Sequence, residues 1–390
     1  MRQLTRLLVI AMALTPSAFA CAPVSAKSTE PSAEPNAGAD RKDTATPDAG
    51  DEKQHAPHVQ KTDARKLVVT FFDVGQGDSA LVQTPSGKTI LIDGGPPEAG
   101  PVLVEKLKAM GIEALDLVIA SHPHADHIGG LVDVVRAFKV RAFLDSGVAH
   151  TTPTFRDYLA EVERQKEKNG AKFWVARKGR TIRLDEGAVV VEVLAPEEPL
   201  LFGTRSDVNS NSVVVRLTYE SAAFLFTGDA EAGTEERLVK QSDKLRVSVL
   251  KVAHHGSRHS TTPEFLRAVQ PDAAVISCGR GNSYGHPKPK TLKALEAVAK
   301  VYRTDRDGTV IVTTDGKALE YKRLGVVERP QEGTPIVIKG AAYVASRRAK
   351  TFHRSDCPGA AKIRAANRVN FGSWGEAAAS GRKPHRGCMP

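Results

Sequence analysis

The chain has 390 residues, of which 41% are hydrophobic, enough for a sizeable core and for two domains of ordinary size. This composition indicates a globular protein with attachments and excludes a chain that is disordered throughout. The formal net charge of +10 is uneven, because from Ile336 onward eleven basic residues stand against two acidic ones, a net +9. We expect this end to face a polyanion; a solvated basic tail is the alternative.

The first twenty residues have the pattern of an export signal. Arg2 and Arg6 precede an apolar run at 7–14, and Ala18-Phe19-Ala20 has the small-x-small form that signal peptidase cuts. The run is too short for a permanent membrane span. Simple cleavage and lipid attachment at Cys21 are both open, with an uncleaved amphipathic helix less favoured. We therefore expect an exported protein that is periplasmic, extracellular or lipid-anchored.

Composition divides the rest of the chain. Residues 21–64 contain five prolines among small and polar residues and very few large apolar ones, so we expect a flexible tether. A folded domain is predicted at 65–326, a second linker at 327–342 and a basic module at 343–390.

The hydrophobic pattern predicts an α/β domain. Strands are expected at 67–72, at 80–83 and in GKTILIDGG, followed by a helix at 102–110 and a buried strand at 115–120. Further helices are expected at 155–168, 234–241 and 291–300, and further strands at 189–194, 213–219, 222–226, 247–252 and 273–277. Many short strands with a few helices imply two sheets covered by helices.

The stretch SHPHADHIGG, directly after the strand at 115–120, crowds four metal-ligand side chains together: His122, His124, Asp126 and His127. Residues two apart past a strand share a side, so His122 and His124 can converge on one ion while Asp126 and His127 face a second. Imidazoles with a carboxylate suit zinc and also admit manganese. The alternative is a polar surface loop. Two ions about 3.5–4 Å apart would share a hydroxide and perform hydrolysis.

Two later stretches supply what such a site lacks. Asp229 in FLFTGDA follows a strand and is expected to bridge both ions. His254 and His255 in LKVAHHGS follow another buried strand, and one of them should complete the second ion's shell; His254 is favoured. We predict that Asp126, Asp229 and His255 are catalytic. Taken alone, the Gly-Asp of FTGDA is more often a turn than a ligand site, and a pair of adjacent histidines is often structural.

These motifs together resemble a known family. DVGQGDS, LIDGG, SHPHADHIGG, NSNS, FTGDA, HHGS and NSYGHP occur in that order between about Lys66 and Leu324. The series resembles the metallo-β-lactamase-type hydrolase domain at the C-terminus of ComEC, the bacterial competence DNA-uptake channel. The resemblance implies a four-layer αββα sandwich with a binuclear centre at one edge. No polytopic membrane segment is present in this sequence, so we do not expect it to be the transport channel itself.

The sequence departs from the wider superfamily, in which many members supply another histidine before the bridging aspartate. His150 is the only histidine in that interval, and we expect it in a loop far from the site. Asn209 and Asn211 stand where the ligand should be, so the first ion would be loosely held or better suited to manganese. His286 is a substitute ligand, a phosphate contact or a plain turn residue.

Three aspartates lie in the glycine-rich motifs: Asp73, Asp78 and Asp93. We expect them to act behind the ligands, fixing imidazole tautomers and loop shape. Ordinary turn aspartates are the alternative.

The basic end raises a separate metal question. His353 and Cys357 are separated by three residues, and His385 and Cys388 by two, a spacing that can close a tetrahedral zinc site. The segment resembles the Ada-type metal-binding module of some secreted nucleases, although members usually carry cysteine where His385 stands. A structural zinc would stabilise this segment of about fifty residues, which is too short to fold on the strength of its hydrophobic core alone. A Cys357–Cys388 disulfide is the alternative in an oxidising compartment. Cys278 is expected in the core.

The sequence leaves three functions open. The favoured one is a phosphodiesterase or nuclease that cuts DNA, in single-stranded form, through a metal-bound hydroxide, with the basic module holding phosphates. The second is an extracellular hydrolase of another ester or phosphodiester, such as wall choline, teichoic acid or a lactone; the missing histidine argues against a β-lactam. The third is a catalytically inactive lipoprotein that binds nucleic acid or wall.

Overall fold

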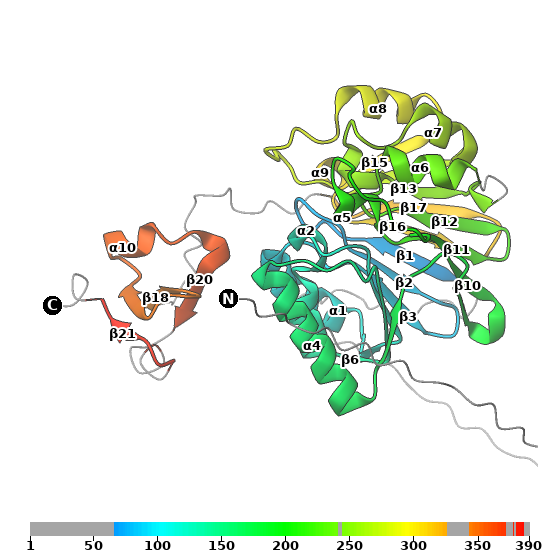
Figure 1. The fold of residues 1–390 in the computed structure, drawn as a ribbon. Helices are drawn as coiled ribbons and strands as arrows, with labels where there is room; N and C mark the ends of the chain where they lie inside the picture. Colours follow the sequence, from blue (N-terminus) through cyan, green and yellow to red (C-terminus); the bar gives the residue numbers. More distant parts are fainter. Residues whose placement is uncertain (1–65, 241–243, 326–342, 372–376, 378–379, 386–390) are drawn as a thin grey trace, which may run out of the picture. The chain divides into compact units, whose positions relative to one another are not determined.

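The computed structural model describes residues 66–240, 244–325, 343–371, 377 and 380–385. Two large sheets make up the part from Leu67 to Arg323 (Figure 1). The first has eight strands in the order β17 (Leu319–Arg323), β16 (Val310–Thr314), β1 (Leu67–Phe71), β2 (Ala80–Gln83), β3 (Thr89–Ile92), β5 (Leu117–Ala120), β7 (Ala142–Asp145) and β8 (Lys172–Val175). The second has seven, in the order β15 (Lys300–Arg303), β14 (Ala273–Ile276), β13 (Val249–Lys251), β12 (Ala222–Phe226), β11 (Val214–Tyr219), β10 (Val189–Ala195) and β9 (Thr181–Leu184).

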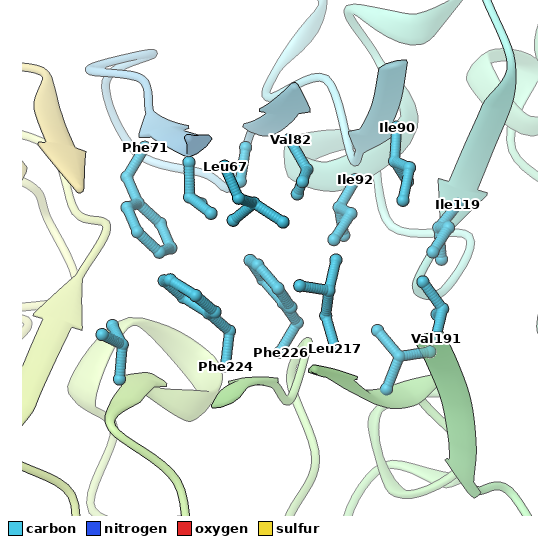
Figure 2. Packing of buried hydrophobic residues seen from close by; sticks show 14 of the residues in the cluster. Leu67, Phe71, Val82, Ile90, Ile92, Ile119, Val191, Leu217, Phe224 and Phe226 are labelled. Carbon is cyan, nitrogen blue, oxygen red and sulfur yellow. The ribbon is translucent and has the colours of Figure 1, made fainter. Parts of the chain in front are cut away.

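The main core lies between the two sheets. Alternate residues of each strand point inward, since successive side chains of a strand point to opposite faces. Phe71 of β1 and Phe226 of β12 stack across this layer with ring centroids 5.9 Å apart, and Leu217 and Val191 belong to the same cluster. Figure 2 shows these side chains filling the space between the sheets.

Helices cover the outer face of each sheet. A second cluster joins the first sheet to α1 (Gly100–Ala109), α3 (Leu131–Ala137) and α4 (Pro153–Asn169). A third joins the second sheet to α6 (Ala232–Val239), α7 (Pro263–Val269) and α8 (Pro289–Glu296), and Cys278 is buried in it as expected. Helix, sheet, sheet, helix is the four-layer αββα sandwich, so the expected fold class is confirmed.

Short elements complete this part of the chain. They are β4 (Ala114–Leu115) paired with β6 (Lys139–Val140), the helices α2 (Ala125–Ile128), α5 (Asp207–Ser210) and α9 (Thr304–Asp307), and the 3₁₀ turns η1 (Pro97–Ala99), η2 (Asp185–Gly187) and η4 (Ala253–Gly256).

Several elements differ from the sequence-based expectation, which did not include the strands β7, β8 and β9 or the helices α3 and α7. The helix expected at 291–300 ends at Glu296, because Lys300 to Arg303 pair with β14 as strand β15. The hairpin of β16 and β17 was not foreseen. It returns to the first sheet, where Val312 lies opposite Val69 of β1.

The basic end forms a four-stranded sheet in the order β20 (Arg368–Phe371), β18 (Tyr343–Ser346), β19 (Thr351–Arg354) and β21 (Lys383–Pro384), with α10 (Pro358–Ala361) and η5 (Ala365–Asn367). Two small clusters hold it, one around Phe352 and Phe371 and one around Val344 and Cys357. Among all described residues no helix is long and apolar enough to cross a membrane. The export signal, Cys21, the tether and Cys388 lie outside the described residues.

Candidate metal centre

The ligands expected from the sequence all follow strands at one edge of the two sheets. Those after β5 of the first sheet are His122 and His124, with Asp126 and His127 in α2; those after β12 and β13 of the second are Asp229, His254 and His255. β12 and β13 are parallel neighbours, so their carboxyl ends lie at the same edge. His254 and His255 have φ angles of 50° and 54°, a conformation that L-residues seldom adopt and that is typical of functional sites.

The loop DVGQGDS packs directly against α2. The amide of Asp78 donates to the carbonyl of Asp126 at 3.1 Å. Gly77 has a φ of 151°, and a Cβ at this position would lie 2.3 Å from the same carbonyl oxygen. Only glycine permits this approach, which brings Asp78 next to the histidines.

Three sets of these side chains have ligand atoms that all lie within 4.8 Å of one another. One consists of Asp78, His127 and Asp229, and the other two, which share no residue, are the two ligand groups. The first group consists of His122, His124 and Asp229, and the second of Asp126, His127 and His255. Each group therefore offers two imidazoles and one carboxylate, a set that suits zinc and also admits manganese.

Asp229 faces both groups. Its Oδ2 lies 3.8 Å from His122 Nε2, and its Oδ1 lies 3.1 Å from His127 Nε2 and 3.7 Å from His255 Nε2. The two oxygens of Asp229 therefore face different groups.

Several of these atoms are buried without a hydrogen-bond partner: His127 Nε2, His255 Nε2 and Asp229 Oδ1. His127 Nε2 and Asp229 Oδ1 are 3.1 Å apart but lack hydrogen-bond geometry. Buried polar atoms left unsatisfied in this way are costly and call for an explanation such as a bound ion. The residues present therefore fit a pair of divalent ions.

The far nitrogens of the imidazoles are held by carboxylates. Asp93 lies 2.8 Å from His127 Nδ1 and accepts from the amide and the hydroxyl of Ser121, each at 2.7 Å. Asp78 Oδ1 lies 3.2 Å from His255 Nδ1, whose ring also lies 2.9 Å from the carbonyl of Ser277. Such contacts leave Nε2 of each ring directed at the centre.

Sequence reasoning missed Lys251, which stands behind Asp78. Its side chain is 5% exposed, and its Nζ lies 2.7 Å from Asp78 Oδ2 and donates to the carbonyl of Val252 at 2.9 Å. A lysine in the buried run LKVA was the available signal, because lysine is almost never fully buried unless it is paired.

The charges at the centre favour a cation. Burial lowers the pKa of His122 and His124, which keeps these imidazoles neutral, as metal ligands must be. Burial alone would also lower the pKa of His127 and His255, but the facing carboxylates, Asp229 foremost, outweigh it and raise both, that of His255 to about 10. The second group thus stabilises positive charge where an ion would sit.

His254, the histidine favoured from the sequence, belongs to neither group; His255 takes that place. His254 Nε2 lies 3.6 Å from Asp229 Oδ2, while its Nδ1 lies 3.5 Å from Glu231 Oε1. Glu231 was not foreseen. Its carboxylate also pairs with Arg205 and accepts from the Asn209 amide at 3.3 Å.

The polar residues around the centre have different roles. Asn211 holds a loop, because its Oδ1 accepts from the amide of Leu201 at 2.9 Å and its Nδ2 donates to the carbonyl of Leu201 at 2.8 Å. Asp73 accepts from the amide of Gly75 at 3.1 Å and shapes the turn of DVGQGDS. Asn209 has a buried Oδ1 without a partner.

Two further histidines border the centre. The ring of His286 lies 5.7 Å from that of His254, and burial, followed by the charges of His255 and His254, lowers its pKa to about 4. His150 lies in a loop, as expected, but nearer the centre than expected. Its ring lies 5.7 Å from that of His124, because the loop after β7 turns back toward α2. His150 is in neither ligand group.

The basic end contains a separate cluster. His353, Cys357 and His385 lie within 4.8 Å of one another, and the two imidazoles stack with centroids 4.5 Å apart. Cys357 Sγ lies 3.8 Å from His353 Nδ1, yet Cys357 is disulfide-bonded. The structure therefore contains features of both alternatives left open by the sequence, and the zinc site stays a prediction.

Comparison with known proteins gives a consistent result. The model of the metallo-beta-lactamase superfamily matches residues 72–280. The chain is 30% identical to ComE operon protein 3 of Bacillus subtilis (strain 168) over 62% of its own length and 32% of that protein's. It is 32% identical to competence protein ComA of Neisseria gonorrhoeae, over 67% and 34% of the two lengths. The chain thus spans about a third of these relatives, as that coverage shows.

Among solved structures, Igni18, described as a novel metallo hydrolase from the hyperthermophilic archaeon Ignicoccus hospitalis KIN4/I, aligns with 63% of this chain and 98% of its own. The identity is 18% and the TM-score 0.43.

Proposed function

The chain belongs to the metallo-beta-lactamase superfamily, and on that basis we propose that it is a metal-dependent phosphodiesterase that hydrolyses DNA. The observation that carries the proposal is the position of Asp229, whose two carboxylate oxygens face two groups of imidazole and carboxylate ligands. Similarity to competence proteins supports DNA as the substrate.

When bound, two divalent ions supply an activated water for attack at phosphorus and neutralise charge on the phosphoryl oxygens. We assign His122 and His124 to one ion and Asp126, His127 and His255 to the other, with Asp229 shared between the two groups and His255 in place of His254. Asp93 and Asp78 hold the rings of His127 and His255 at their far nitrogens.

Residues on the open side bind rather than ligate in this proposal. His254 has its Nε2 3.6 Å from Asp229 and its Nδ1 3.5 Å from Glu231, and it belongs to neither ligand group, so it can contact a substrate oxygen. His150, beside His124, borders the other group and can do the same.

We further propose that the protein is exported, by cleavage after Ala20 or with lipid on Cys21, and that the basic module at 343–390 holds phosphates. A structural zinc on His353, Cys357, His385 and Cys388 is part of this proposal, with the disulfide as its competitor.

The test uses purified full-length protein with manganese or zinc on labelled single-stranded DNA, double-stranded DNA, RNA and bis-p-nitrophenyl phosphate. We expect metal-dependent release of acid-soluble nucleotides, greatest from single-stranded DNA. Cleavage of the small diester without nucleotide release would indicate another phosphodiester substrate. Inactivity on all four with both ions would overturn the proposal.

A further inference from the structure

Two exposed aromatic rings lie on loops that contact residues around the metal centre. Phe202 is 77% exposed and Tyr284 is 62% exposed. Every other aromatic side chain in the described ranges is buried or half-buried. Proteins that bind single-stranded nucleic acid stack the bases on aromatic side chains.

Several contacts hold the loop that carries Tyr284. Its ring stacks on His286 with centroids 5.8 Å apart and planes at 23°, and His286 in turn lies 5.7 Å from His254. Lys288 Nζ donates to the carbonyl of Tyr284 at 2.6 Å, and Asn282 bonds both backbone groups of His286. The loop is fixed while one face of the tyrosine remains open.

Phe202 belongs to a loop that is fixed in the same way. Asn211 holds the neighbouring Leu201, and Asp207 accepts from the amide of Thr204 at 2.7 Å. The next residue, Arg205, pairs with Glu231, whose Oε1 lies 3.5 Å from His254 Nδ1. Both aromatic loops therefore reach His254 through one or two contacts.

A cavity of about 350 Å³ adjoins this side of the centre. Its wall includes Glu231 together with Arg205, Arg258 and His259. Glu231 pairs with Arg205 and so offsets one of the two guanidinium charges. Arg258 Nε lies 3.3 Å from His259 Nε2, a ring whose pKa burial lowers, so the positive charge of Arg258 remains for an anion.

We propose that the loops of Phe202 and Tyr284 and this cavity form a cleft for unpaired nucleotides, in which a base stacks on Tyr284 and a neighbouring phosphate enters the cavity against Arg258. Phe202 is the second stacking platform. The inference rests on the proposed function and deepens it, because it identifies the substrate as a polymer with unpaired bases. A teichoic acid or another phosphodiester without nucleobases would not fit such a cleft.

The test compares oligothymidylate with an oligomer of the same sugar-phosphate backbone that lacks bases. Affinity is measured by fluorescence anisotropy with and without divalent ions, and kcat and KM are measured separately. Tyr284→Ala removes the ring, Tyr284→Phe retains it as the matched control, and Arg258→Gln removes the cavity charge.

We expect the wild type to prefer oligothymidylate, and Tyr284→Ala to weaken that preference by roughly 5- to 150-fold, the range for one stacked base. Tyr284→Phe should keep the preference. Arg258→Gln should weaken binding of both oligomers and reduce the salt slope by about 0.7, the value for one phosphate contact on a single strand.

Equal binding of both oligomers by the wild type, or a base preference that persists with both rings removed in Tyr284→Ala/Phe202→Ala, would overturn the inference. The two proposals fail separately. Base-dependent binding without hydrolysis would refute the proposed function alone, whereas hydrolysis of both oligomers at equal rates would refute this inference alone.

Discussion

Replacing Lys251 with methionine tests whether the metal centre depends on a buried charge pair. Lys251 Nζ lies 2.7 Å from Asp78 Oδ2, and the two side chains are 5% and 7% exposed. Methionine fills a similar volume but leaves the carboxylate buried and unpaired. Breaking a buried pair in this way costs about 3–5 kcal/mol of unfolding free energy.

The pKa of Asp78 gives a second measure of the pair. Burial raises this pKa, but Lys251 and then His255 outweigh burial and lower it from 3.8 to about 2. A shift of that size corresponds to about 2.5 kcal/mol in favour of the charged form, since one unit is about 1.4 kcal/mol. A lowered folded pKa contributes stability that is present above 3.8 and lost as the pH falls toward about 2. In Lys251→Met the pKa of Asp78 should rise, so the stability gap to the wild type should narrow as the pH falls.

The assay is urea unfolding near neutral pH and at about pH 4, with the double variant Lys251→Met/Asp78→Asn and the surface control Lys300→Met. The double variant should recover most of the loss, because no charge remains unpaired, and Lys300→Met should change stability by less than about 0.5 kcal/mol. If Lys251→Met costs less than about 1 kcal/mol near neutral pH, or if the single losses simply add in the double variant, the pair does not have this role.

Three further predictions follow from the site and its surroundings. Asp229→Asn should lower the rate on bis-p-nitrophenyl phosphate about 10²-fold or more and should also lower the metal content measured by elemental analysis. An unchanged rate at saturating manganese would show that Asp229 only caps a turn. Burial raises the pKa of Asp145 to about 6, so its contribution to stability is lost as the pH rises from 3.8 through 6. In urea unfolding, Asp145→Asn should therefore be more stable than the wild type by up to about 3 kcal/mol near pH 8. A gain in unfolding free energy that persists at pH 4 would contradict this. Deleting residues 342–390 should reduce the slope of log DNA affinity against log salt concentration by about 0.7–0.9 per lost phosphate contact, without slowing turnover of the small diester. His385→Ala should reproduce part of this reduction only if zinc holds the module. Identical slopes for the full-length protein, the truncation and His385→Ala would mean that the tail binds something else.

That the candidate ligand side chains come together could be predicted, because each of the three stretches that carry them directly follows a strongly apolar strand and most of the histidines stand within one short stretch. The choice between His254 and His255 could not, because it depends on two positive φ angles within η4. Spacing alone does not reveal which of two adjacent side chains faces the centre when the backbone leaves the strand conformation.

Contacts between distant segments were the main omission. His150 reaches His124 only because the segment after β7 returns to α2, and Arg205 meets Glu231 across 26 positions. The hairpin of β16 and β17 did carry a local signal, since Asp315-Gly316 separates two strand-like runs, a frequent hairpin turn. The end of α8 did not, because residues up to 299 favour helix and only pairing with β14 selects a strand at Lys300.

The packing between the sheets sets the spacing of the candidate ligand side chains. His122 and His127 come from the first sheet, Asp229 and His255 from the second, and the apolar layer that includes Phe71 and Phe226 separates the two (Figure 2). The packing of this layer determines the distances between ligand side chains from opposite sheets. Any sliding of one sheet over the other changes the distances between ligands from opposite sheets, while distances within one sheet stay the same. Substitutions deep in the sandwich, with no contact to the centre, can therefore retune how tightly each ion is held.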